Sequence, residues 1–364
     1  MREIFISLCM IVKNEESYLP SCLDSVKGVV DEMIIVDTGS TDRTKEIALS
    51  YGAKIYDFEW IDDFSAARNY GIEKATGEWI LVLDADEELE EETAKRLRDE
   101  LKATTADALI LLRKEELEGQ MYADYDLTGL LRVFRNRKGY FYERMYHEEI
   151  DPAIERLGGK IETRYDLMIW HHGIKSQIVQ GDTKRFERAI RILQKAIEQY
   201  PSNYGLYIFL GLEFYNAGEY EKAKQALLYA LKSNLEGLKL SLIHEAYTIL
   251  GYIALHENDT ESAKNYAYKA LEVHKLYENL ISSQFLYRHT LSLLGLTLME
   301  DAHQQALEGR SALGLANAKE AQKIFLELKS YPDQPDKSKE RIKKLLGYCD
   351  NLITILQKSS KVAA

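Results

Sequence analysis

Short apolar runs alternate with helical patterns through the first part of the chain. The runs occupy residues 4–12, 33–36, 53–58 and 79–83, and each has the length of a strand. Polar residues that favour helix starts follow the first three runs, and we expect the first helix from about Asn14 to about Val26. This alternation predicts an α/β domain with a mostly parallel sheet and helices on both faces.

The fourth run leads directly into two aspartates, Asp84 and Asp86, on either side of Ala85. In open α/β sheets, ligands bind at the carboxyl ends of the strands. Carboxylates two residues apart suit a hard cation, Mg²⁺ or Mn²⁺, that is shared with the phosphates of a ligand. Acidic residues also suit the first turn of a helix, so the spacing alone is compatible with a metal site and with a helix start.

Further charged residues fall near the same edge of the predicted sheet. Asp37 ends the second run, and Arg68 lies in the helical stretch before the fourth. Carboxylates that hold a cation, together with an arginine, suit a nucleoside diphosphate. The chain contains neither GxxxxGK[ST] nor GxGxxG. Their absence argues against a P-loop NTPase and against a dinucleotide-binding Rossmann domain.

Four segments of the first half resemble the successive signatures of family 2 glycosyltransferases. They are residues 6–15, 36–42, 67–69 and 83–86, in the order and spacing of that family. The likeness is tight over roughly residues 1–100 and looser over residues 100–178. The resemblance implies an A-type nucleotide-sugar-binding fold, and a catalytic domain that spans residues 1–178.

The same resemblance assigns roles in binding a nucleotide-sugar donor. It implies that Asp86 binds a metal ion and thereby assists the leaving group. It implies that Arg68 lies near the pyrophosphate of the donor. It places Val12 and Asp37 at the nucleoside and Asp84 on the ribose side. The remaining donor-binding positions are Asn14, Glu15 and Ala85.

Two adjacent histidines, His171 and His172, follow an apolar stretch and precede a glycine. Such histidines can be ordinary packing residues. In relatives, a histidine before a similar glycine completes the metal site, and His171 matches that position. His172 stands where an aromatic residue is more usual and is the alternative ligand. An imidazole beside a carboxylate favours Mn²⁺ over Mg²⁺.

An acidic segment follows two further predicted strands, at residues 107–113 and 127–134. An inverting glycosyl transfer needs a base near the nucleophile of the acceptor, and a carboxylate is the usual choice. By position, Glu148 resembles the base of the family. Glu149 is the second candidate and Asp151 the third. A solvated acidic turn is the alternative interpretation of this segment.

From about residue 183, helical patterns rich in Ala, Leu, Tyr and Lys replace the strands. They match the tetratricopeptide pattern, in which an aromatic residue precedes a Leu-Gly pair and a second aromatic residue. A small, a large and another small residue then follow. One repeat comprises Tyr207, Leu210, Gly211, Phe214, Ala223, Leu227 and Ala230, and related positions precede and follow it. We therefore expect an all-α, tetratricopeptide-like domain over residues 179–364, with less regular helices at 290–298 and 316–328 and a capping helix at 338–356.

Composition and charge limit the classes of partner and the cellular location that we expect for the protein. The net charge of −12 argues against nucleic acid as the main partner, because the phosphate backbone requires a basic surface. No apolar run approaches the length of a membrane span. The three cysteines show no metal-binding spacing, so we expect a reducing, cytoplasmic location.

We expect a metal-dependent, inverting transfer of a hexose from a UDP-sugar to a peptide, at a Cys thiol or a Ser/Thr hydroxyl. A short catalytic domain joined to tetratricopeptide-like helices resembles bacterial enzymes that glycosylate ribosomally made peptides, including bacteriocins. We expect the helical domain to dock the acceptor and to form a homodimer. A transferase of lipopolysaccharide core or other surface glycans is one alternative. A non-catalytic tetratricopeptide scaffold with a degenerate transferase domain is another.

Overall fold

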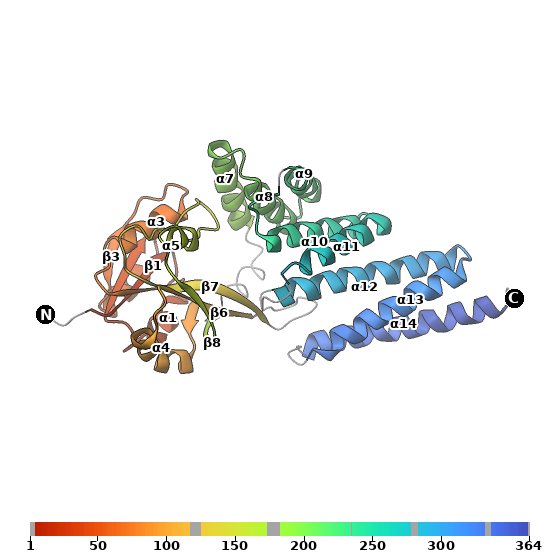
Figure 1. Cartoon of the computed structure of the whole chain (residues 1–364), viewed down its shortest axis with the longest axis horizontal. Helices are drawn as coiled ribbons and strands as arrows, with labels where there is room; N and C mark the ends of the chain where they lie inside the picture. Colours follow the sequence, from red (N-terminus) through yellow and green to blue (C-terminus); the bar gives the residue numbers. More distant parts are fainter. Residues whose placement is uncertain are drawn as a thin grey trace. The chain divides into compact units, whose positions relative to one another are not determined.

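The computed structural model describes residues 4–116, 125–172, 183–233, 235–277, 283–331 and 336–362. The chain forms two compact units, one that contains the strands and one that is helical (Figure 1). The predicted boundary between residues 178 and 179 lies outside the described residues.

Within the described residues, the first unit is built on an eight-stranded sheet with the order β3-β2-β1-β4-β7-β6-β8-β5. Its strands are β1 (Ile6–Val12), β2 (Glu32–Asp37), β3 (Lys54–Asp57), β4 (Trp79–Val82), β5 (Glu87–Leu89), β6 (Ala108–Glu116), β7 (Tyr125–Arg135) and β8 (Ile161–His171). β1 to β4 pair in parallel, β6 and β8 also pair in parallel, and β7 lies antiparallel between β4 and β6. The prediction of a mostly parallel sheet is confirmed.

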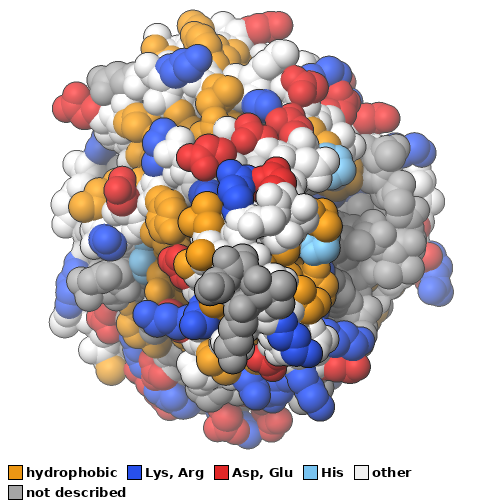
Figure 2. All heavy atoms as spheres, turned by 90° about the vertical axis from the view of Figure 1, so that its right-hand side faces the viewer, with side chains coloured by type: hydrophobic (Ala, Val, Ile, Leu, Met, Phe, Trp, Pro, Cys, Tyr) orange, Lys and Arg blue, Asp and Glu red, His pale blue; other side chains and the backbone are white. Residues whose placement is uncertain are grey.

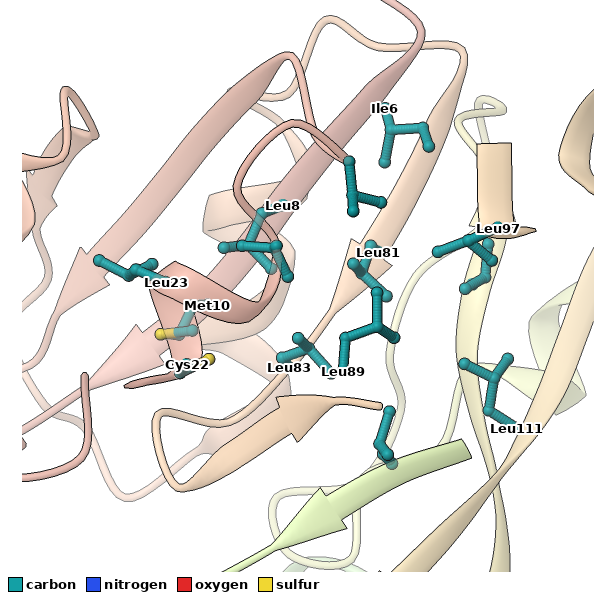
Figure 3. Packing of buried hydrophobic residues seen from close by; sticks show 14 of the residues in the cluster. Ile6, Leu8, Met10, Cys22, Leu23, Leu81, Leu83, Leu89, Leu97 and Leu111 are labelled. Carbon is teal, nitrogen blue, oxygen red and sulfur yellow. The ribbon is translucent and has the colours of Figure 1, made fainter. Parts of the chain in front are cut away.

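Helices cover both faces of this sheet. They are α1 (Leu19–Ser25), α2 (Thr44–Ser50), α3 (Phe64–Ile72), α4 (Glu91–Ala103) and α5 (Asp151–Arg156). Successive side chains of a strand point to opposite faces. Leu8 and Met10 of β1 accordingly join the apolar cluster of α1, α2 and α4, part of which Figure 3 shows. Cys9 joins a second cluster, with Ile72 of α3 and Ile154 of α5. The expected covering of both faces is confirmed.

The first helix is shorter than the sequence predicted. It begins at Leu19 rather than near Asn14, and Pro20 occupies its first turn, where a missing N–H costs nothing. Asn14 itself has φ = 58°, a left-handed conformation that cannot start a helix. Its side chain bonds instead to the loop after β2.

The alternative of a helix start at Asp84 is wrong. The residues that follow the aspartates form β5, which pairs antiparallel with β8. Helix α4 begins only at Glu91, where the side chain of Glu90 accepts a hydrogen bond from the backbone N–H of Thr93 as an N-cap.

The second unit is helical. It contains most of α7 (Thr183–Gln199), followed by α8 (Tyr204–Asn216), α9 (Tyr220–Leu231), α10 (Leu240–His256), α11 (Thr260–His274), α12 (Ser283–Leu307), α13 (Ser311–Ser330) and α14 (Asp336–Val362). A Cβ on Gly211 of α8 would lie 2.6 Å from Leu227 Cγ of α9, so only glycine allows this helix pair to approach so closely. Ala223 and Ala230 of α9 are fully buried. The predicted small-residue pattern thus forms the packed face of a helix pair.

One face of the molecule shows how apolar and charged side chains are distributed on the surface. Figure 2 shows a face on which hydrophobic side chains lie in small groups among charged side chains of both signs. Such scattered apolar groups are ordinary on protein surfaces. Among the described residues, no helix combines the length and the apolar character needed to cross a membrane.

Candidate active site

The loops after β1 and β2 are fastened to each other by side-chain hydrogen bonds. The Asn14 side-chain oxygen accepts from the backbone N–H of Thr41 at 2.7 Å. Thr44 Oγ1 accepts from the backbone N–H of Glu15 at 2.7 Å. The two loops that the sequence assigns to the nucleoside therefore form one connected surface at the carboxyl ends of neighbouring parallel strands.

Asp37 organises the second of these loops. Its side chain is only 1% exposed and accepts hydrogen bonds from the backbone N–H groups of Gly39 and Ser40, both at 3.1 Å. Burial opposes its charge, but the bonds from Ser40 and Gly39 outweigh burial and hold the pKa of Asp37 below its usual value. The backbone N–H of Thr38 donates to the carbonyl oxygen of Val12 at 3.0 Å, which ties β2 back to β1.

The turn after β4, which we call the donor turn (Asp84 to Asp86), is held by two arginines. Arg68 Nη2 of α3 donates to Asp84 Oδ1 at 2.8 Å, and Arg132 Nη2 of β7 donates to Asp84 Oδ2 at 2.9 Å. Burial disfavours the charged carboxylate, but the two guanidinium groups outweigh it and hold the pKa of Asp84 well below its usual range. Ala85 is buried between the aspartates.

Asp86 meets His171 at the end of β8. The distance from His171 Nε2 to Asp86 Oδ2 is 3.2 Å. The pairing of β5 with β8 brings the two residues together, because Glu87, next to Asp86, is opposite His171 in the ladder. The ring of His172 turns elsewhere: its Nε2 lies 3.5 Å from Glu88 Oε1.

A divalent cation fits the Asp86–His171 pair. One carboxylate oxygen and one imidazole nitrogen are donors that Mn²⁺ accepts. The described residues contain no group of three or more His, Cys, Asp or Glu side chains that would hold a metal ion by themselves. Such a cation would therefore take its other ligands from a donor's phosphates and from water.

Glu148 lies against the same arginine that holds the donor turn. Arg68 Nε donates to Glu148 Oε1 at 2.6 Å, and the Glu148 side chain is 14% exposed. Glu149 faces another group, because Arg144 Nη1 lies 2.9 Å from its Oε2. Asp151 begins α5. Of the three carboxylates that the sequence offers as a base, Glu148 is thus the one that contacts Arg68.

Hydrogen bonds join α3 to the segment that carries Glu148. Asn69 Nδ2 donates to the carbonyl oxygen of Tyr142 at 2.9 Å, and Asn69 Oδ1 accepts from the backbone N–H of Tyr142 at 2.7 Å. The backbone N–H of Phe64 donates to the carbonyl oxygen of Met145 at 3.0 Å. In the signature at residues 67–69, the arginine therefore reaches the carboxylates while the asparagine holds the neighbouring backbone.

Sequence reasoning assigned no role to two buried members of this site, Arg132 and Glu87. Arg132 Nη2 donates to Glu87 Oε1 at 2.5 Å, and Glu87 is 0% exposed. Burial raises the pKa of Glu87, and the charge of Arg132 opposes that shift. A signal was present in the sequence, since Arg132 is a lone charge in the apolar run of residues 130–134.

Both units of the chain are similar to known protein families. The profile "Glycosyl transferase family 2" matches residues 7–166, and a tetratricopeptide repeat profile matches residues 244–273. The chain belongs to glycosyl transferase family 2. The donor turn, Arg68 and Glu148 all lie inside the matched range of this family 2 glycosyltransferase.

Curated relatives match long stretches of this family 2 glycosyltransferase. A TPR repeat-containing protein of Synechococcus elongatus is 37% identical over 317 residues, which cover 83% of this chain and 75% of the relative. The SPbeta prophage-derived glycosyltransferase SunS of Bacillus subtilis is 30% identical over 63% of this chain. The aligned region spans only 53% of SunS.

Among solved structures, S. aureus TarS 1–349 in complex with UDP is similar at 16% identity with a TM-score of 0.40. The alignment covers 83% of this chain and 92% of TarS 1–349.

Proposed function

We propose that this family 2 glycosyltransferase transfers a hexose from a UDP-sugar to a peptide acceptor, with inversion at the anomeric carbon. The observation that carries the proposal is the position of Arg68. Its guanidinium contacts Asp84 of the donor turn at 2.8 Å and Glu148 at 2.6 Å. The carboxylates assigned to the donor and to the acceptor thus contact one buried side chain. Donor and acceptor bound at these carboxylates would lie next to each other, as a direct displacement requires.

Glu148 acts as the base in this proposal. Arg68 holds its Oε1, and among the described residues no hydrogen-bond or ion-pair partner occupies Oε2. That oxygen takes the proton of the acceptor hydroxyl or thiol. The acceptor's electron pair forms the new bond to the anomeric carbon from the face opposite the diphosphate. The bond from the anomeric carbon to the diphosphate oxygen breaks, and its electron pair leaves with UDP.

The donor turn binds the leaving group in this proposal. Asp86 and His171 would hold a divalent cation, and their oxygen and nitrogen donors favour Mn²⁺. Such a cation, when bound, neutralises the charge of a departing nucleoside diphosphate. Asp84 is kept ionised by Arg68 and Arg132, so it accepts hydrogen bonds from the donor without first losing a proton.

A peptide is the proposed acceptor because tetratricopeptide-like helices follow the catalytic domain in the same chain. Such repeats offer extended surfaces for partner chains. The family 2 enzymes of bacterial peptide glycosylation that the chain resembles also combine these parts. A cytoplasmic location and a homodimer through the helical unit remain predictions, and light scattering tests the second.

Mass spectrometry tests the transfer. The protein is incubated with Mn²⁺, several UDP-hexoses and peptides that contain Cys, Ser or Thr, and in a parallel reaction surface glycans replace the peptides. We expect a mass increase of one hexose on a peptide. Transfer only to surface glycans would refute the peptide acceptor and support the alternative.

Substitution of the acidic pair tests the base. Glu148→Gln should lower kcat by roughly 10²- to 10⁴-fold, because the base is lost, while UDP affinity stays at the wild-type value. Glu149→Gln is the matched control and should keep most of the turnover. The reverse pattern, with Glu149→Gln inactive and Glu148→Gln active, would assign the base to Glu149.

A further inference from the structure

The donor turn rests on a buried ion pair between Arg132 and Glu87, which lies outside the four signatures at residues 6–15, 36–42, 67–69 and 83–86. Glu87 Oε2 accepts a hydrogen bond from the backbone N–H of Asp84 at 3.0 Å. Arg132 Nη2 donates to Glu87 Oε1 at 2.5 Å and to Asp84 Oδ2 at 2.9 Å. These three contacts close a ring that includes both the backbone and the side chain of Asp84.

Arg132 stands where regular strand pairing stops. The ladder of β4 with β7 ends at the pair Leu81–Val133, and Arg132 is the next residue of β7 beyond it. On its other side, β7 pairs with β6 through Val133 and then Leu131, so Arg132 is the extra residue of a β-bulge. Bulges redirect side chains next to active sites. Here the bulge directs the guanidinium of Arg132 to the donor turn, which lies beyond the end of the β4–β7 ladder.

Stability alone does not explain two buried charges at this place. Apolar residues of similar volume often stabilise a fold as well as a buried ion pair does, because the pair loses its hydration. Glu87 is 0% exposed and Arg132 is 7% exposed. What the pair adds is a fixed geometry, because Asp84 is held at its N–H by Glu87 and at its carboxylate by both arginines.

We infer that Arg132 and Glu87 are positioning residues that fix the donor turn for the nucleoside diphosphate. They act through Asp84 and through the start of β5, so Asp86 is presented to His171. Neither is a catalytic residue in this account. The inference rests on the proposed function, since it takes the turn to be the diphosphate site.

Calorimetric titration of the full chain with UDP and Mn²⁺ tests this inference. In Arg132→Met, which keeps the length of the side chain without its charge, the Kd for UDP should rise roughly 10- to 100-fold, as for other residues that orient ligand-binding groups. Arg132→Lys should recover part of the affinity. The matched control is Arg135→Met on the same strand, because Arg135 pairs with exposed Glu78 at 2.7 Å, outside the turn.

The titration separates positioning from a merely structural role. A structural defect lowers the fraction of protein that binds but leaves the Kd of the folded fraction unchanged. A folded Arg132→Met variant with the Kd of the wild type would therefore overturn the inference. If Arg132→Met does not fold, Glu87→Gln provides the readout, since glutamine keeps an oxygen for the Asp84 N–H and loses only the charge. A wild-type chain that binds no UDP refutes the proposed function instead.

Discussion

Acid should weaken the helical unit, and one contribution to this loss comes from the buried histidine His244. His244 of α10 is fully buried, its Nε2 lies 2.7 Å from Thr290 Oγ1, and its Nδ1 meets the hydroxyl of Tyr277. Burial, with smaller contributions from His274 and His289, lowers the pKa of His244 to about 3. The neutral imidazole thus fits its site, and the imidazolium does not.

Proton linkage gives the sign and the size of this change in the free energy of unfolding. The pKa of His244 lies below its unfolded value of 6.5, so the contribution of the neutral ring is fully present above pH 6.5 and is lost as the pH falls toward 3. At pH 5 the loss is about 2 kcal/mol, since each unit below 6.5 costs about 1.4 kcal/mol. For a unit of this size, that corresponds to a melting temperature lower by roughly 4–8 °C.

Unfolding of the full chain at pH 7 and pH 5, followed by far-UV circular dichroism, measures this loss. His244→Gln should reduce the difference between the two pH values by about 2 kcal/mol, because glutamine does not titrate. His256→Gln removes an exposed histidine from the same helix and should leave the difference as in the wild type. Equal losses in His244→Gln and the wild type would refute the reasoning.

Two further predictions concern the frame of the active site. Gly77→Ala should destabilise the protein by about 1–3 kcal/mol, since the added Cβ would lie 2.8 Å from the backbone nitrogen of Ser7. Thermal melting checks this, with Gly347→Ala as the control because its Cβ would meet nothing within 4 Å. Asn69→Ala should lower kcat more than it raises the KM of the donor, because Asn69 holds Tyr142 in the segment that carries the base. Steady-state kinetics with unchanged kcat would contradict that role.

The sequence predicted the elements whose signals are local. The alternation of strands and helices was predicted correctly, because apolar periodicity is a local signal. Asp37 and Asp84 lie at the carboxyl ends of β2 and β4, where the order of the strands along the chain places them. The predicted start of the first helix was wrong. The Asn14 side chain accepts a hydrogen bond from the backbone N–H of Thr41 in another loop, and Asn14 has a left-handed backbone conformation there.

The inner support of the donor turn was not predictable from local patterns. Glu87 looked like one more acidic residue after Asp86, and its burial depends on the pairing of β5 with β8. Arg132 reaches Asp84 only because β7 bulges there and its ladder with β4 has ended. Register and bulges arise from contacts between distant segments, which periodicity does not encode.

Calorimetric titration of the wild-type chain with UDP, with and without Mn²⁺, tests the central claim most directly. The account predicts binding that requires Mn²⁺ and that Asp86→Ala abolishes while the circular dichroism spectrum stays unchanged. Binding of equal strength without Mn²⁺, or no binding of UDP by the wild type, would contradict it.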